Sequence, residues 1–169
     1  MGYTTDFEGR FKIEPPLDPA QVNYLQQFSR TRWMKRDSSK VAFMEDPLRD
    51  ALNLNIGAEG EHFVGIATGD YGQTHDESII DYNNPPKTQP GLWCQWVPTD
   101  DGQHLEWDRG EKFYDYVEWL KYLIEHFFEP FGRVVSGSVE WDGEERGDVG
   151  LIEVVKNIVT VKTGRITYG

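Results

Sequence analysis

Alternation of apolar and polar residues opens the chain. In "YTTDFEGRFKIEPP" the side chains of Phe7, Phe11 and Ile13 alternate with polar neighbours, which predicts a β-strand that ends at two prolines. A helix should follow, because Asp18 suits an N-cap and Pro19 the first helical position. Its apolar face would carry Val22, Leu25 and Phe28 at helical spacing, with the stem of Arg32 beyond them.

The middle of the chain has weaker periodicity. Residues 36–61 read as an irregular insert or connection, with a short helix started by Asp46 and Pro47. A short apolar strand, "HFVGIA", comes next. Residues 68–91 form a long loop rich in Gly, Asp, Asn and Pro, and loops of that length are often functional.

The second half alternates again. "LWCQWVP" and "HLEW" predict a hairpin with Asp101-Gly102 at its tip. A helix from about Gly110 to Glu129 follows, and the segments "RVVSGSVEW", "GLIEVV" and "NIVTVK" predict three strands, the last two joined at Lys156-Asn157. This order predicts a single α+β domain spanning residues 1–169, an antiparallel sheet with its two main helices on one face.

Charge narrows the possible partners. The chain of 169 residues carries a net charge of −12, and the span from Asp100 to Asp148 holds 14 acidic and 5 basic residues. Such a surface repels a nucleic-acid backbone, so direct nucleic-acid binding is not expected. The sequence shows neither a membrane-spanning apolar run nor a signal-peptide pattern, and a single cysteine suits a reducing, cytoplasmic compartment.

The second predicted helix carries two faces. Phe113, Val117, Leu120, Ile124 and Phe127 should enter the core, whereas a mixed polar and aromatic face carries Asp115, Trp119, Tyr122 and His126. Tyr and Trp suit surfaces that are partly buried and partly hydrogen-bonded, so this second face is a candidate site for a protein partner. The alternative is that another part of the chain covers it.

The long loop and the strand after it hold a second candidate site, for a small ligand. Carboxylates, an imidazole and stackable rings occur at Asp70, His75, Asp76, Tyr82 and Trp93. Their spacing fits no metal motif, so no metal, cofactor or catalytic residue is assigned. Tyr82 and Trp93 could instead stack on a planar ligand such as a nucleobase. Cys94 is expected to be a buried structural thiol beside Trp96.

Three stretches are distinctive: the opening "MGYTTDFEGRF", the middle "SIIDYNNPPKTQPGLWCQWVP" and the helix "GEKFYDYVEWLKYLIEHFFEPFG". In these stretches the chain resembles a group of small uncharacterised bacterial and bacteriophage proteins. The resemblance implies a cytoplasmic bacterial or phage setting and no particular activity.

Three functions follow as hypotheses. The first is a non-enzymatic binding protein that engages a host protein through an acidic and aromatic surface around the second helix. The alternatives are a small-ligand or nucleotide-binding domain, which could be an enzyme, built on residues 70–96, and a structural or assembly component.

Overall fold

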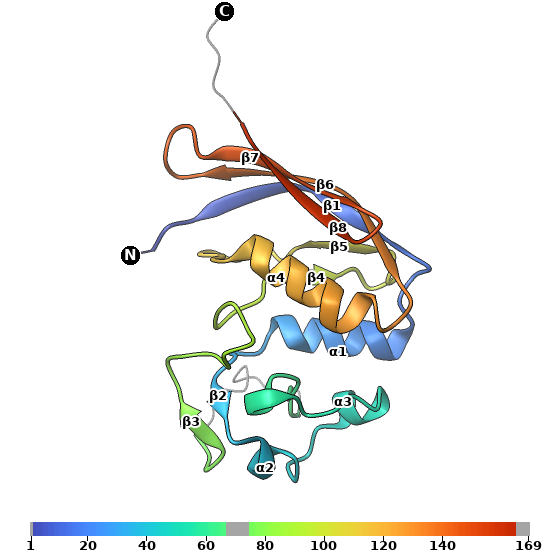
Figure 1. The fold of residues 1–169 in the computed structure, drawn as a ribbon, viewed down its shortest axis with the longest axis vertical. Coiled ribbons are helices and arrows are strands. Elements are labelled where there is room, and N and C mark those ends of the chain that lie inside the picture. Colours follow the sequence, from blue (N-terminus) through green and yellow to red (C-terminus); the bar gives the residue numbers. More distant parts are fainter. Residues whose placement is uncertain (1, 67–74, 165–169) are drawn as a thin grey trace, which may run out of the picture. The chain divides into compact units, whose positions relative to one another are not determined.

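The chain divides into two compact units. The computed structural model describes residues 2–66 and 75–164 (Figure 1). Unit 1 combines Met1–Leu17 with Gln95–Gly169, and unit 2 is Asp18–Cys94. The sequence pattern gave no sign of this division, because the two segments of unit 1 lie far apart along the chain.

Unit 1 is built on a six-stranded antiparallel sheet, and with its helices the protein is an α+β structure. The strands run in the order β4-β5-β1-β6-β7-β8. Their bounds are Thr5–Glu14 for β1, Trp96–Pro98 for β4, His104–Trp107 for β5, Val134–Gly143 for β6, Val149–Val155 for β7 and Ile158–Thr163 for β8. The first predicted strand, the hairpin with its tip at Asp101-Gly102 and the three final strands are therefore confirmed.

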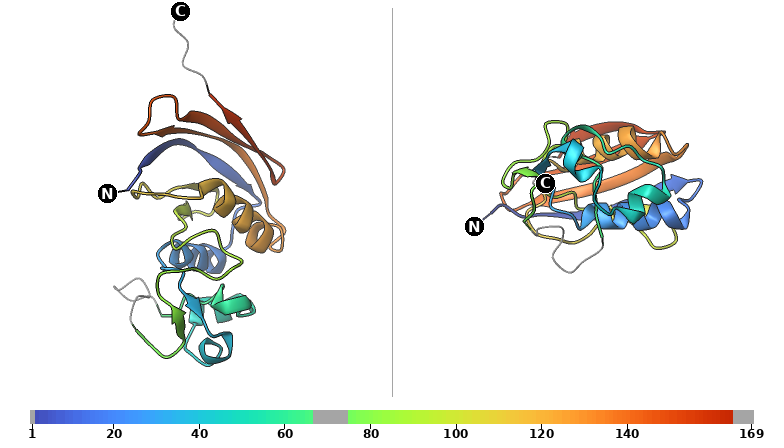
Figure 2. Two further views of the ribbon diagram at one scale, coloured as in Figure 1. Left: turned by 60° about the vertical axis from the view of Figure 1, so that its left-hand side comes forward. Right: turned by 90° about the horizontal axis from the view of Figure 1, so that it is seen from below.

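The central pair of strands approaches closely at two glycines. β1 and β6 pair over their whole length, with Phe7 opposite Trp141 and Phe11 opposite Gly137. Gly9 has φ +102°, and a Cβ there would lie 2.6 Å from the carbonyl oxygen of Ser138. A Cβ on Gly137 would lie 2.9 Å from the carbonyl oxygen of Arg10. Only glycine fits these positions, where β1 and β6 follow the long curves visible in Figure 2.

One face of this sheet carries an aromatic core. Phe7 makes edge-to-face contacts with Trp96, Trp107 and Phe113, with ring centroids 5.3–5.8 Å apart. Val139 and Ile152 are fully buried on the neighbouring strands. Edge-to-face rings suit such a core because the positive edge of one ring meets the negative face of the next.

The helix of unit 1 is shorter than the sequence pattern predicts. It comprises α4 (Tyr116–Leu123) and a π-helical turn, η2 (Ile124–Phe128), rather than starting near Gly110. Lys112 and Asp115 have φ of +59° and +57°, a left-handed conformation that a right-handed helix does not admit. Leu120 and Phe127 are fully buried, as expected for the core face.

Unit 2 is built around one regular helix. α1 (Pro19–Ser29) begins with a capping box, in which Asp18 accepts from the Gln21 amide and Gln21 accepts from the Asp18 amide. Short elements complete the unit: β2 (Lys35–Arg36), α2 (Ser38–Val41), α3 (Pro47–Ala51), η1 (Ala58–Gly60) and β3 (Ile79–Asp81). The start of α1 and the short helix after Asp46 match the sequence prediction.

Two local predictions were wrong, and the structure adds detail to a third. The described residues of "HFVGIA", 62–66, form no strand, and Gly65 has φ +67° there. Residues 36–61, which were expected to be irregular apart from the helix after Asp46, hold two further short helical elements, α2 and η1. The strand expected from Leu92 begins only at Trp96.

None of the helices in the described ranges has the length and apolarity needed to cross a membrane.

Candidate functional site

The aromatic face predicted on the second helix is mostly inside the protein. Trp119 and Tyr122 are only 0% and 5% exposed. Tyr122 stacks on His126 with ring centroids 3.9 Å apart and meets Trp119 edge to face at 5.5 Å. Asp115 remains exposed as the residue that precedes α4. The expectation of an exposed aromatic surface on this helix is therefore corrected, because rings pack on more than one of its sides.

The candidate ligand residues of the long loop are partly engaged with one another. Asp70 lies outside the described residues. The rings of His75 and Tyr82 stack with centroids 5.5 Å apart, and the guanidinium of Arg32 lies 4.3 Å from the Tyr82 ring centroid. The Tyr82 ring thus already has two stacking partners within the chain, which weakens its role as a platform for a planar ligand.

Asp76 has a structural role instead of facing a ligand. Its carboxylate accepts from the Ser78 amide at 2.8 Å, from the Ser78 hydroxyl, and from the Arg36 guanidinium at 3.0 Å. Partial burial raises the pKa of this carboxyl, but the bonds from Ser78 and Arg36 outweigh it and hold the pKa below its ordinary value. Arg36 is itself buried, so the ion pair ties β2 to the segment before β3.

The last ligand candidate, Trp93, and the cysteine next to it lie at the end of unit 2. Trp93 is half-buried, and the neighbouring Leu92 carbonyl accepts from the Trp33 amide at 2.8 Å. Cys94 is fully buried, as expected for a structural thiol. The structure thus brings His75 and Tyr82 together, whereas Asp76 pairs with Arg36.

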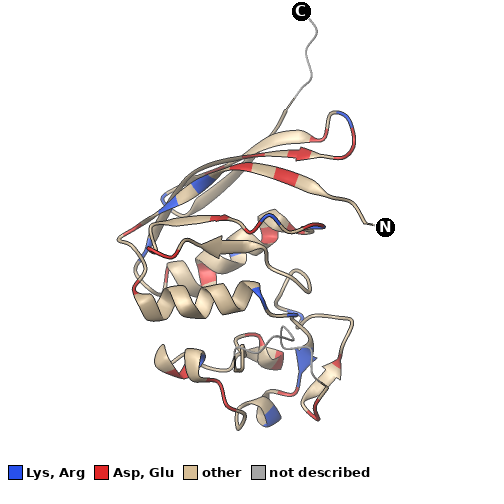
Figure 3. Ribbon diagram, turned by 180° about the vertical axis from the view of Figure 1, so that it is seen from behind, with Lys and Arg blue, Asp and Glu red and all other residues tan. Residues whose placement is uncertain are grey.

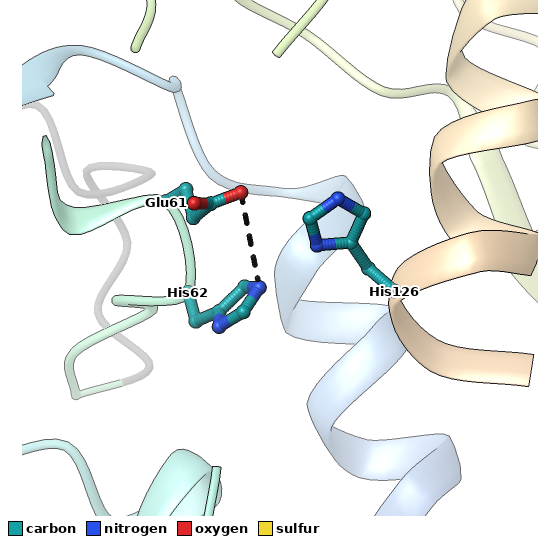
Figure 4. Close-up of side chains that lie close together, drawn as sticks. All are labelled: Glu61, His62 and His126. Atoms are coloured by element: carbon teal, nitrogen blue, oxygen red, sulfur yellow. Dashed lines mark ion pairs between the residues drawn. The ribbon is translucent and has the colours of Figure 1, made fainter. Parts of the chain in front are cut away.

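A buried carboxylate and imidazole in unit 2 were not anticipated from the sequence. Glu61 Oε1 lies 4.0 Å from His62 Nε2 (Figure 4). His62 Nδ1 contacts the Asn55 carbonyl at 3.0 Å, and because a carbonyl only accepts, Nδ1 carries the proton. The Tyr24 hydroxyl and the Gln89 amide donate to the carbonyls of His62 and Glu61, both at 2.8 Å. Adjacent residues in an irregular segment give no sequence signal for such a pair.

Unit 1 carries an open hollow of about 970 Å³ over the strands of its sheet. Its lining includes four carboxylates, two on β1 and two on β6. By register Asp6 stands opposite Asp142, and Glu8 opposite Glu140. All four are exposed, on the face of the sheet opposite the buried rings of Phe7 and Trp141. Figure 3 shows the acidic positions as red segments of the long strands.

The residues paired with Glu8 across the sheet change from acidic to apolar and then to basic. Glu140 pairs with Glu8 on one side and with Leu151 on the other, and Leu151 pairs with Lys162. In the neighbouring set of paired residues on the same face, Val149 stands opposite Asp142. The hollow therefore has an acidic half on β1 and β6 and an apolar strip on β7. We call these seven positions the acidic sheet face: Asp6, Glu8, Glu140, Asp142, Val149, Leu151 and Lys162.

The strand ends around this face are firmly anchored. Asp148 accepts from the Tyr3 hydroxyl at 2.6 Å and from the indole N–H of Trp141 at 3.0 Å. The hydrogen bond to Asp148 raises the pKa of Tyr3. Burial raises the pKa of Tyr116, whose ring packs against Trp141, to about 12. Both phenols therefore stay neutral at physiological pH, and the charged groups that line the hollow are its four carboxylates and two cations, Arg109 and Lys162.

The carboxylates of this face are left in like-charged pairs. Like charges directly opposite each other on neighbouring strands destabilise a sheet. Arg10 and Lys12, farther along β1, stand opposite Ser138 and Ser136 instead. The alternation in "DFE" and "EWD" was the signal in the sequence, but only the register shows that the acidic residues face one another.

Comparison with known proteins adds no assignment: no protein-family model, curated protein or solved structure matches the chain.

Proposed function

We propose that the protein is a non-enzymatic binding protein that docks a basic segment of a partner protein on the acidic sheet face of unit 1. The observation that carries the proposal is the pairing of Asp6 with Asp142 and of Glu8 with Glu140 inside the hollow. A sheet that places carboxylates opposite one another loses stability, and sites kept at such a loss are often functional.

The chemistry of the rows defines the segment that fits. Lysine or arginine side chains would lie over β1 and β6, where they relieve the repulsion between the carboxylates. An apolar side chain would lie one or two strands away over Leu151 and Val149, since neighbouring strands are about 4.8 Å apart. The partner segment is thus basic with an adjacent apolar residue.

This proposal keeps the function expected from the sequence but moves its site. An acidic surface remains, whereas the aromatic part of the expected surface is buried at Trp119 and Tyr122. A host protein, as the resemblance to phage proteins implies, is one source of such a partner, and a cytoplasmic setting belongs to the same proposal.

Hexalysine serves as the test probe, with binding measured by isothermal titration calorimetry. The double variant Glu8→Gln/Glu140→Gln removes one charge from each strand of the acidic sheet face. Exposed ion pairs contribute roughly 0.2–1 kcal/mol each, so we expect its affinity to fall roughly 2- to 30-fold. The wild-type affinity should also fall with added salt.

The matched control is Glu118→Gln/Glu125→Gln, which removes the same net charge from exposed positions of α4 and η2. We expect it to change the affinity less than twofold. Equal losses of affinity in both double variants would mean that hexalysine responds only to the net charge of the protein. A larger loss of affinity in the control would place the site on the helix. Either result would overturn the proposal.

A further inference from the structure

The last strand of the sheet has an open edge. β8 pairs with β7 on one side, and among the described residues no strand pairs with its other side. Open edges are usually protected by prolines, bulges or several charges. β8 has neither a proline nor a register shift, and its one charged side chain, Lys162, lies 3.6 Å from Glu153.

The hydrogen-bonding pattern identifies the backbone groups on this edge. Lys156 and Asn157 have φ of +46° and +70°, as in a two-residue hairpin turn, where the closing residues Val155 and Ile158 exchange hydrogen bonds. From there, hydrogen-bonded and non-hydrogen-bonded residue pairs alternate along β7 and β8. This alternation predicts a hydrogen bond from the Gly164 amide to the Val149 carbonyl, which is present at 2.7 Å. The residues between the bonded positions point their amides and carbonyls outward: Val159, Val161 and Thr163.

Half of the side chains of β8 are apolar. Val161 is 45% exposed although it stands opposite the fully buried Ile152, on the core face of the sheet. Ile158 is 70% exposed on the opposite face. A strand added to this edge would therefore cover apolar surface as well as satisfy outward-pointing backbone groups.

We propose that a second copy of this chain occupies the edge, with β8 antiparallel to β8 of the other copy about a two-fold axis at Val161. In this register Val161 meets Val161, Val159 meets Thr163, and Thr160 meets Lys162. The three outward-pointing residues of each copy form about six hydrogen bonds, two for each bonded pair. The isologous contact closes on itself, so it yields a dimer rather than a fibre.

The charges on β8 itself are compatible with a second copy as the occupant, whereas the net charge of each chain opposes the association. The single cation of β8, Lys162, falls opposite Thr160, so no like charges oppose each other across the edge. The two valines at the axis also extend the apolar strip of the core face from one copy into the next. The contact is small, and interfaces below about 1,200 Å² are typically weak, so we expect a Kd above about 10 µM. Because each chain carries −12, salt should strengthen this association.

Two sets of variants test the dimer. Val161→Pro removes one outward N–H while leaving the β7–β8 bonds intact, and Val161→Thr keeps it. By sedimentation velocity we expect Val161→Pro to be monomeric at concentrations where wild type and Val161→Thr dimerise. Val161→Cys should form a disulfide between copies under mild oxidation, since paired residues lie about 5.5 Å apart, whereas Thr163→Cys on the same face should not.

The outcomes separate this dimer from other behaviour. A wild-type protein that stays monomeric up to millimolar concentration at high salt would overturn it. Equal disulfide formation by Val161→Cys and Thr163→Cys would overturn the register even if a dimer forms. Capture of a strand from another protein, with no self-association, would also contradict it. The opposite salt dependences keep this test distinct from the binding of hexalysine.

Discussion

Neutralising one carboxylate of the acidic sheet face should stabilise the protein. In Glu8→Gln the side chain keeps its size and its place opposite Glu140, but the like-charged pair is gone. Side chains directly opposite on antiparallel strands have Cβ atoms 4.5–5.5 Å apart, so the carboxylates lie roughly 6 Å apart. Two unit charges at that distance in water repel by about 0.7 kcal/mol, and 0.1 M salt reduces this to about 0.4 kcal/mol.

The assay is urea unfolding of the whole protein, followed by tryptophan fluorescence. We expect Glu8→Gln to raise the free energy of unfolding by about 0.4–0.7 kcal/mol, with the larger gain at low salt. Glu14→Gln is the matched control on the same strand and face, where the carboxylate lies 2.8 Å from the Lys12 ammonium. That exposed ion pair is worth about 0–1 kcal/mol, so the control should be neutral or slightly destabilising.

A double-mutant cycle separates pairwise repulsion from a general effect of net charge. If Glu8 and Glu140 repel each other, Glu8→Gln/Glu140→Gln should gain less than the sum of the two single variants, because the pair is removed only once. Additive gains that do not depend on salt, or any loss of stability in Glu8→Gln, would refute the reasoning behind the acidic sheet face.

Three further predictions test the rest of the structure. Phe11→Ala removes a fully buried ring that meets Trp96 edge to face at 5.6 Å, so chemical denaturation should show a loss of about 3–5 kcal/mol; a loss below 1 kcal/mol would contradict the core described here. Asp76→Asn should cost about 1–2 kcal/mol at pH 7. Because the folded pKa of Asp76 is lowered, its contribution is present above the ordinary value of 3.8 and is lost as the pH falls below it, so wild type and variant should converge in acid unfolding curves; a constant difference would refute the assignment. Cys94 is 0% exposed, so a thiol reagent should label it only under unfolding conditions, and rapid labelling of the native protein would show that it is accessible.

Local signals predicted the regular elements well. Phe7, Phe11 and Ile13 alternate because β1 buries one face, and Asp18 with Pro19 fixes the start of α1. The turn at Lys156-Asn157 was predictable because these two residues separate two apolar segments, and both have positive φ in the structure. These features depend on residues that are adjacent in the chain, so the local sequence is enough to predict them.

The wrong predictions of secondary structure arose where contacts distant in the sequence determine the local conformation. The left-handed conformations of Lys112 and Asp115 delay the start of α4, although the residues around them favour a helix. "HFVGIA" has the composition of a strand, but its described residues, 62–66, pair with no strand among the residues of unit 2 that the structure describes. Composition cannot show whether a strand finds a partner.

The candidate sites depended even more on long-range pairing. The helical periodicity placed Trp119 and Tyr122 on a second face correctly, but whether that face is covered depends on the rest of the chain. The acidic sheet face joins residues near the N-terminus to residues more than 130 positions away, and a register shifted by one residue would put them on the other side of the sheet. No single-sequence pattern fixes that register.

The central claim, that a basic segment docks on the acidic sheet face, is tested most directly by a titration of the ¹⁵N-labelled protein with hexalysine, followed by amide chemical shifts. The account predicts that the largest shifts occur at residues 6–8, 140–142 and 149–151, and that Glu8→Gln/Glu140→Gln needs a roughly 2- to 30-fold higher hexalysine concentration to reach half of them. Shifts concentrated on α4 and η2, or spread evenly over every exposed carboxylate, would contradict it.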